Sequence, residues 1–187
     1  MTKTSNVKAD FVQPIAVLTL ICLVCAALLG FLNGLTVEPI AAKEAEVAAA
    51  ARKQVLPEAD DFALVSVELP DKFDDGTANY VTEIYEATNG TGYVFMVSGD
   101  GYGGKKTMNL AVALDPSGAI IKTTTLSDEE TPGMGKKTAD ADWTDRFVGL
   151  TADGVDGIAA ISGATISSNH YKNSIRSVFA AYDYINK

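Results

Sequence analysis

Charged residues are absent from one long stretch near the start of the chain. No Asp, Glu, Lys or Arg lies between Asp10 and Glu38, and most positions there are Leu, Val, Ile, Phe or Ala. A helix needs about 20 such residues to cross the hydrocarbon core of a bilayer. A cleaved signal peptide has a shorter apolar core of about 7 to 15 residues. We therefore expect residues 11–36 to form an uncleaved transmembrane helix after a short terminus at 1–10.

The charges on either side of this segment predict its orientation. Lys3 and Lys8 outnumber Asp10 before the helix, which favours a cytoplasmic amino terminus. The rest of the chain then lies outside the cytoplasm. Residues 37–57 are rich in Ala, Glu and Lys, with Pro39 where a helix can begin and Pro57 where one must end, so we expect a helical stalk there.

After the stalk, apolar and polar residues alternate with a period of two, which is typical of half-buried β-strands. Turn sequences separate the runs: Asp-Asp-Gly, Asn-Gly-Thr-Gly and Asp-Pro-Ser-Gly. An antiparallel meander follows from this order. The expected strands are 63–69, 80–88, 92–98, 108–114 and 119–125.

The pattern changes towards the carboxyl terminus. Thr138 and the acids after it predict a short helix through Trp143 and Phe147, and residues 157–162 predict a last strand. The final segment has core residues at helical spacing, so we expect a C-terminal helix and an α+β domain over 58–187. Those core residues are Tyr171, Ile175, Val178, Phe179, Tyr182 and Ile185.

Composition excludes several kinds of site. The net charge of −9, from 15 basic and 24 acidic residues, argues against nucleic-acid binding, which depends on Lys and Arg. The two cysteines, Cys22 and Cys25, both lie in the apolar segment, where a cysteine is usually a small packing residue. With His170 as the single histidine, we expect no metal site and no disulfide framework.

Two glycine-containing segments are candidates for ligand binding. Ser162-Gly-Ala-Thr-Ile-Ser-Ser168 joins an expected strand to a helix, and backbone N–H groups at such a junction suit a phosphate. Simple capping by Ser167 or Ser168 explains the same residues. The glycines of Gly99-Asp-Gly-Tyr-Gly-Gly104 permit close approach to a ligand, although an ordinary flexible loop has the same composition.

With these segments and Glu130-Thr-Pro-Gly-Met-Gly135, the chain resembles the covalent FMN-binding domain of the G subunit of the Rnf complex. The related C subunit of the sodium-translocating NADH:quinone oxidoreductase is similar. The resemblance implies one FMN per chain, joined through a phosphodiester bond to Thr165. It implies further cofactor contacts from Ser162, Gly163, Ala164, Ser167, Ser168, Gly101, Tyr102, Gly103, Gly104, Glu130, Thr131, Pro132 and Gly133.

The resemblance also implies a function. The chain would be an electron carrier, without catalytic residues of its own, in an ion-translocating ferredoxin:NAD oxidoreductase of the cell membrane. Its partners would be other subunits with iron–sulfur and flavin centres, and a separate flavin transferase would load Thr165. Three alternatives stay open: the quinone-oxidoreductase C subunit, a stand-alone extracytoplasmic flavin reductase, and a membrane-anchored assembly module without flavin.

Two positions depart from the family pattern. The flavin transferase motif has an aspartate three residues before the serine of S-G-A-T, and this chain has Ala159 there. Where the family often has histidine two residues before the E-T-P-G glutamate, this chain has Asp128. The first departure concerns the efficiency of flavin attachment. The second concerns local hydrogen bonding.

Overall fold

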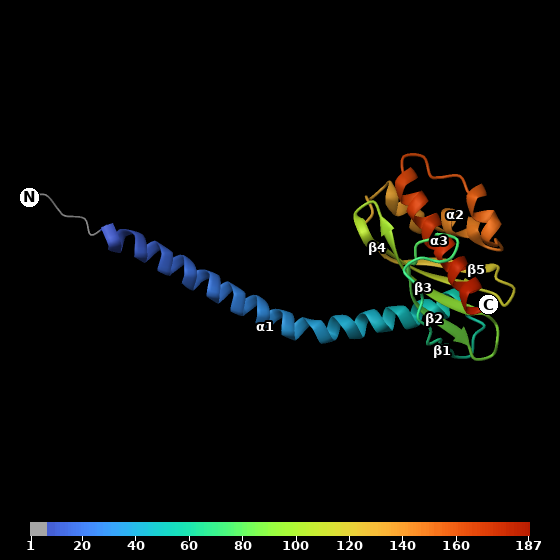
Figure 1. Ribbon diagram of the computed structural model, residues 1–187, viewed down its shortest axis with the longest axis horizontal. Helices are drawn as coiled ribbons and strands as arrows, with labels where there is room; N and C mark the ends of the chain where they lie inside the picture. The colour runs from blue at the N-terminus through green and yellow to red at the C-terminus, as the bar shows by residue number, and fades with distance from the viewer. Residues whose placement is uncertain (1–6) are drawn as a thin grey trace, which may run out of the picture. The chain divides into compact units, whose positions relative to one another are not determined.

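The computed structural model describes residues 7–187 (Figure 1). Its first helix, α1, runs continuously over Val7–Val55 and passes through Pro39. The chain divides into two compact units, with the boundary inside α1 between Glu46 and Val47. Part of the expected cytoplasmic terminus, residues 1–6, lies outside the described residues.

The first unit is the apolar part of α1. Val12–Val37, 26 residues, is long and apolar enough to span a membrane, and its side chains are exposed. Hydroxyls within it bond to the backbone of the preceding turn: Thr19 Oγ1 donates to the Ile15 carbonyl at 2.9 Å and Thr36 Oγ1 to the Leu32 carbonyl at 3.0 Å. Polar groups satisfied inside one helix are compatible with a lipid environment.

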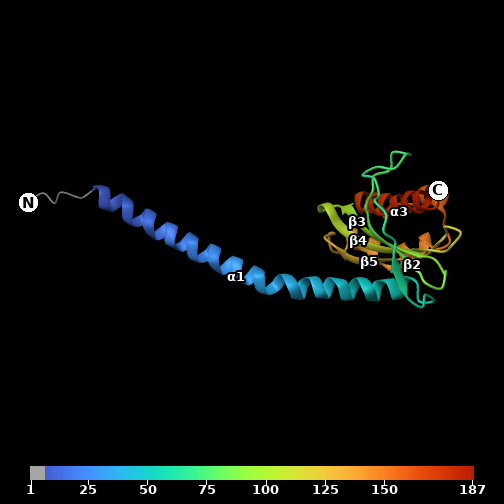
Figure 2. The same ribbon diagram turned by 60° about the horizontal axis from the view of Figure 1, so that its bottom comes forward.

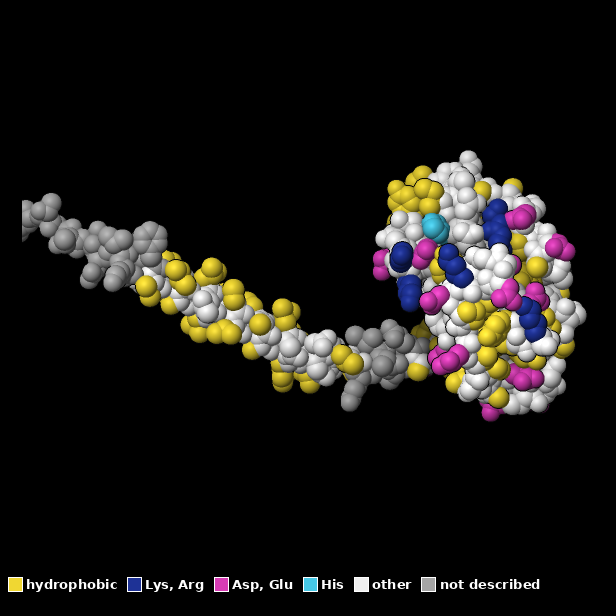
Figure 3. Space-filling model, viewed as in Figure 1, with side chains coloured by type: hydrophobic (Ala, Val, Ile, Leu, Met, Phe, Trp, Pro, Cys, Tyr) yellow, Lys and Arg dark blue, Asp and Glu magenta, His cyan; other side chains and the backbone are white. Residues whose placement is uncertain are grey.

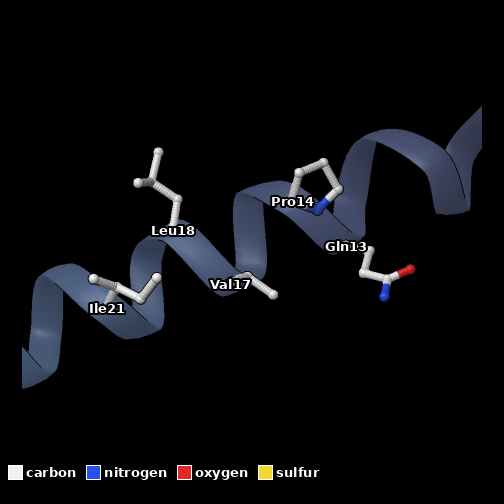
Figure 4. A pocket seen from close by; sticks show the side chains of 5 residues that line it. All are labelled: Gln13, Pro14, Val17, Leu18 and Ile21. Carbon is white, nitrogen blue, oxygen red and sulfur yellow. The ribbon is translucent and has the colours of Figure 1, made fainter.

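A shallow hollow lies on the surface of this unit. Figure 4 shows its five lining side chains, all from neighbouring turns of α1: Gln13, Pro14, Val17, Leu18 and Ile21. Pro14 lies in the helix interior, where it cannot donate a backbone hydrogen bond. Because a single helix forms the whole hollow, it is a surface groove rather than an enclosed site.

The second unit contains a five-stranded antiparallel sheet in the order β1-β2-β3-β4-β5, which confirms the predicted meander. Central strands β3 and β4 have the longest pairing, for example Val94 opposite Ala113. Residues 94–97 of β3 and 110–114 of β4 are buried on both faces, which explains the continuous apolar sequence there. The bounds are β1 Phe62–Leu64, β2 Val81–Ala87, β3 Tyr93–Gly101, β4 Gly104–Leu114 and β5 Ile120–Asp128.

The predicted C-terminal helix is present as α3, Thr165–Ile185, and it covers one face of the sheet. In Figure 2 it lies on one side of the strands, and the last turns of α1 lie on the other. In the core beneath α3, four of the six predicted helix residues are buried: Tyr171, Ile175, Val178 and Phe179. Tyr182 and Ile185 pack at its edge.

The opposite face is covered by the end of α1. Ala51, Val55 and Leu56 are buried there against sheet residues that include Val94 and Met96. Lys53 Nζ donates to the carbonyl oxygens of Ala59 and Asp60 at 2.6 and 2.9 Å, which satisfies acceptors just beyond the helix end. The folded unit therefore includes the last turns of α1.

Short helices connect β5 to α3. They are the 3-10 helix η1 Gly135–Ala139, α2 Ala141–Thr144, and the 3-10 helices η2 Asp145–Phe147 and η3 Ala152–Gly157. Trp143 and Phe147 lie within this connection, as predicted, and are buried in edge-to-face contact with ring centroids 5.5 Å apart.

The predicted strand at 157–162 is wrong. Those residues form the end of η3 and a turn, because their backbone groups bond locally instead of to a sheet: Ile158 N–H donates to the Val155 carbonyl, and Ile161 N–H donates to Ser168 Oγ at 3.0 Å. The two isoleucines that pack against the core, Ile158 and Ile161, are three residues apart, which is not the spacing of a strand.

Replacing Leu56, which is 2% exposed, tests whether the end of α1 is part of the domain core. We expect Leu56→Ala to lower the free energy of unfolding of fragment 47–187 by about 2 to 5 kcal/mol, because it leaves a cavity against the sheet. Urea unfolding followed by circular dichroism measures the change. The control Val47→Ala, at a side chain 41% exposed, should change stability by less than about 0.5 kcal/mol. Equal effects of the two variants would contradict the described packing.

Candidate functional site

Three segments that are far apart in the sequence meet at one cavity of about 410 Å³. They are the tip of the β3–β4 hairpin, the loop after β5, and the start of α3. Each is one of the glycine-containing motifs of the sequence. The lining residues are Tyr102, Thr131, Met134, Gly135, Gly163, Ala164, Thr165, Ile166 and Ser167.

The hairpin tip contributes Tyr102. Gly101 pairs with Gly104 across the turn, and Gly104 has a φ of +133°, which side chains rarely permit. An added Cβ at Gly101 would lie 2.7 Å from Glu130 Oε1. The glycines therefore let the hairpin bend and approach the loop after β5, which leaves the Tyr102 side chain exposed at the rim of the cavity.

The loop after β5 is a tight turn that leads into η1. The Thr131 carbonyl accepts the N–H groups of Met134 and Lys136 at 3.1 and 3.3 Å, and Gly133 has a φ of +76°. Pro132 and Gly133 favour a turn of this kind. The turn directs Thr131, Met134 and Gly135 towards the cavity.

The start of α3 contributes Thr165, its first residue, which is exposed. No side chain caps this helix: Ser167 Oγ donates to Glu130 Oε2 at 2.6 Å, and Ser168 Oγ accepts the Ile161 N–H. Simple capping by these serines is therefore not the arrangement found. First-turn N–H groups without an intrahelical partner, together with the helix dipole, favour an anion beside Thr165.

Glu130 connects the three segments from behind the cavity wall. Its side chain is 3% exposed and does not line the cavity. Oε1 accepts the Tyr102 N–H at 2.8 Å, and Oε2 accepts the Ser167 hydroxyl. Gly135 leaves room for this carboxylate, since an added Cβ there would collide with Oε2. Glu130 thus bonds to both other segments.

The rim of the cavity is apolar and exposed. Tyr102, Met134 and Ile166 are 62%, 51% and 54% exposed, although side chains of these types are usually at least partly buried. Figure 3 shows hydrophobic side chains gathered at the end of the domain where α3 begins. Exposed apolar groups around a few polar ones are typical of a site that binds an organic ring.

A buried polar pair holds α3 on the sheet beyond the site. The Tyr171 hydroxyl and Thr123 Oγ1 are 2.8 Å apart, and Tyr171 contacts the rings of Trp143 and Phe147. Burial raises the pKa of the Tyr171 phenol far above its ordinary value, so it stays protonated and can donate a hydrogen bond. These aromatic residues belong to the core rather than to the cavity.

The structure separates the sequence-predicted residues into two groups. Thr165, Gly163, Ala164, Ser167, Tyr102 and Thr131 line the cavity; Ser162, Ser168, Gly101, Gly103, Gly104, Glu130, Pro132 and Gly133 lie beside or behind it. Three lining residues were missed: Met134, Gly135 and Ile166. All three lie within the motifs, next to residues that were predicted, and this position was the available signal.

Other polar residues near the site already have partners. Lys136 Nζ bonds Asp128 Oδ1 at 3.1 Å, and the same oxygen accepts the Glu130 N–H at 3.0 Å. Among the described residues, no group of three or more His, Cys, Asp or Glu side chains could hold a metal ion. The cavity is therefore suited to an organic ligand with an anionic group. An FMN, with its ring and phosphate, fits this arrangement.

Comparison with known proteins agrees with the geometry. Residues 101–180 match the model of the FMN-binding domain family, a range that begins at the hairpin tip and includes all three segments. The G subunit of the ion-translocating oxidoreductase complex of Cereibacter sphaeroides is 34% identical over 184 residues, which cover 89% of this chain and 81% of that protein.

Two further relatives carry more specific names. The G subunit of the Na⁺-translocating ferredoxin:NAD⁺ oxidoreductase complex of Acetobacterium woodii is 28% identical, with 91% of each chain covered. The G subunit of the proton-translocating ferredoxin:NAD⁺ oxidoreductase complex of Clostridium ljungdahlii is 31% identical over 68% of this chain and 72% of its own. The chain therefore belongs to the family of G subunits of ion-translocating oxidoreductase (Rnf) complexes and has that family's FMN-binding domain.

Proposed function

We propose that Thr165 carries one FMN through a phosphodiester bond and that the chain is an electron carrier of its complex. One observation carries the proposal: an exposed threonine begins α3 inside a cavity lined by all three motifs. A phosphate on Thr165 Oγ1 would meet the positive end of the α3 dipole. When bound, the FMN supplies a ring that accepts and releases single electrons.

The surrounding residues would hold this cofactor from three sides. Tyr102, Met134 and Ile166 offer apolar surface to the ring, and the Thr131 side chain offers a hydroxyl to its polar edge. Gly163, with a φ of +80°, keeps the backbone close to the phosphate position without a side chain in the way. Covalent attachment would retain the ring at this exposed rim.

Thr165 is an acceptor in the loading reaction rather than a catalyst. Its hydroxyl is weakly acidic, and no hydrogen bond from it to a base is found among the described residues. We infer that a separate flavin transferase provides the base. In that step the pyrophosphate bond of FAD breaks, the threonine oxygen bonds to the FMN phosphorus, AMP leaves, and the base receives the hydroxyl proton.

The names of the relatives indicate the reaction in which this carrier would take part. Two of them are named as subunits of ferredoxin:NAD⁺ oxidoreductase complexes, which supports the same reaction for the complex of this chain. Electrons would enter the flavin from an iron–sulfur centre of a neighbouring subunit and leave to another flavin. These transfers are single-electron steps, which a flavin can perform without a catalytic side chain.

We propose that the chain is a single-pass membrane protein. Residues 11–36 would span the bilayer, 37–57 would form the stalk, and 58–187 would lie outside the cytoplasm, with 1–10 inside. The uncharged segment Val12–Val37 and the basic excess before it support this topology.

A second candidate function is a membrane-anchored assembly module without covalent flavin. Ala159 favours it, because the usual aspartate of the transferase motif is missing. The nearest upstream acid, Asp156, does not replace that aspartate: the Arg176 guanidinium bonds it and holds the pKa of that carboxyl below its usual value. Ala159 itself is exposed, so a transferase can reach the position.

Substitution of Thr165 tests the proposed attachment. Coexpressed with a flavin transferase, the chain should gain the mass of one FMN less water and fluoresce in a denaturing gel. Thr165→Ala should abolish both signals, because it removes the proposed attachment atom, Thr165 Oγ1. Membranes with the variant should also lose ferredoxin-dependent NAD⁺ reduction. The exposed Thr151→Ala is the matched control and should be fully modified. Covalent flavin that persists in Thr165→Ala would falsify the assignment.

Ala159→Asp distinguishes the carrier from the assembly module. We expect the variant to be modified faster than the natural chain by the same transferase, because it restores the acid of the motif, and both to reach complete modification. Intact mass measured over time gives the two rates. If the natural chain stays unmodified while Ala159→Asp is modified, the assembly module is the better description.

A cysteine at the carboxyl terminus tests the topology. Lys187→Cys should react with a membrane-impermeant maleimide in intact cells, because the domain lies outside the cytoplasm. Cys22 and Cys25 lie within the apolar segment and should stay unlabelled in the natural chain. Labelling of Lys187→Cys only after cell lysis would contradict the proposed orientation.

A further inference from the structure

Glu130 is a buried carboxylate that pairs with no cation in the described part of the chain. The ion pairs formed there join Lys43 to Glu46, Lys136 to Asp128, Arg176 to Asp156 and Lys187 to Asp74. None includes Glu130, although it is 3% exposed. Removing a carboxylate from water is costly unless its surroundings compensate for it, so such a group usually has a functional reason.

Hydrogen bonds fix this carboxylate in one position. Both oxygens accept: Oε1 from the Tyr102 N–H at 2.8 Å and Oε2 from the Ser167 hydroxyl at 2.6 Å. Added Cβ atoms at Gly101 and Gly135 would collide with these same oxygens, so the backbone encloses the carboxylate closely. The charge can neither rotate away nor become hydrated without opening the site.

Glu130 lies directly behind the residues that line the cavity. Its two donors, Tyr102 and Ser167, and its neighbour Gly135 all line the wall, whereas Glu130 itself does not. The neighbouring acids differ from it. Asp128 is paired with Lys136, and Glu129 is exposed to solvent. Glu130 is thus the one of these three acids that is both buried and without a cation.

A charge in this position acts strongly on whatever occupies the cavity. Water screens an exposed charge, but a buried one is screened much less. An electron that enters the flavin ring without a proton adds one negative charge to the ring. A fixed carboxylate behind the wall opposes that addition, because like charges repel.

We propose that Glu130 tunes the redox potential of the flavin held at Thr165, and that its buried charge lowers the midpoint potential for one-electron reduction. The inference rests on the proposed function, since it requires flavin in the cavity. One electron passes from a one-electron reductant, such as a reduced iron–sulfur centre, to the flavin ring. No bond of Glu130 forms or breaks. Glu130 is therefore a positioning and electrostatic residue, not a cofactor ligand.

The variant Glu130→Gln removes the charge and keeps the shape. Its carbonyl oxygen can still accept the Tyr102 N–H, and its amide can donate to Ser167 Oγ. In full-length, flavinylated protein in detergent, we expect the equilibrium constant for one-electron reduction to rise at least threefold. At 59 mV per decade this is a shift of about 30 mV to higher potential, measured by spectroelectrochemical titration.

Two control variants separate charge from structure. Glu129→Gln removes the adjacent exposed carboxylate and should leave the potential unchanged, because water screens that group. Ser167→Ala keeps the Glu130 charge and removes one of the donors that partly offset it, so the potential should fall. Opposite effects of Glu130→Gln and Ser167→Ala on the potential support a role of the charge. A rise of similar size in both variants would mean that loosening the site causes the shift, and would overturn the proposal.

Each failure has its own signature. An unmodified mass in the natural chain contradicts the proposed function before Glu130 is tested. A modified natural chain whose Glu130→Gln variant has an unchanged potential contradicts only the tuning role. If Glu130→Gln is not loaded with flavin, Ser167→Ala decides alone: a fall in potential supports the role of the charge, and an unchanged or higher potential contradicts it.

Discussion

The two hydrogen bonds of the Glu130 carboxylate connect the parts of the cavity. One reaches the hairpin tip at the Tyr102 N–H, and the other reaches the start of α3 at the Ser167 hydroxyl. Glu130 itself belongs to the loop after β5, so three segments depend on one side chain. Gly101 and Gly135 are explained by the same group, since a Cβ at either position would collide with it. Formation of this cavity therefore buries the carboxylate, at a cost in desolvation that the rest of the fold must offset.

The sheet and its two covering layers provide that stability. The central strands bury both faces, one beneath α3 and one beneath the last turns of α1. The Tyr171–Thr123 bond and the aromatic contacts of Tyr171 fix α3 on the sheet, which in turn fixes Thr165 at its start. Because the end of α1 is part of the second core, the helix that contains the apolar segment also completes the domain.

Much of this arrangement could be predicted from local patterns. Alternating residues with a period of two identified the meander, and the spacing of Tyr171, Ile175 and Val178 identified α3. The strand expected at 157–162 was wrong, because short apolar runs look alike whether they pair with a sheet or bond to their own turns. The surface that the end of α1 covers could not be fixed from the sequence, since a helix rich in alanine gives little sign of which surface it covers.

The sequence identified the motifs that form the site but not how their residues are arranged around the cavity. Thr165 and Tyr102 were identified, and both line the cavity. Met134 and Ile166 were not, because an apolar residue in a turn is usually assigned to the core, and only the fold leaves these two exposed. Glu130 was also predicted to contact the cofactor, and the structure places it behind the residues that line the cavity. Sequence separation hides such a role, since Glu130 and Ser167 are brought together only by the packing of α3.

Hydrogen exchange of the backbone amides, compared between flavinylated protein and Thr165→Ala, tests whether three separate segments form one flavin site. If they do, exchange in the flavinylated protein should be slower at residues 101–104, 131–135 and 164–168 together, with the edge strand β1 unchanged. Protection confined to the residues around Thr165, with the hairpin tip and the loop after β5 unaffected, would contradict a shared site.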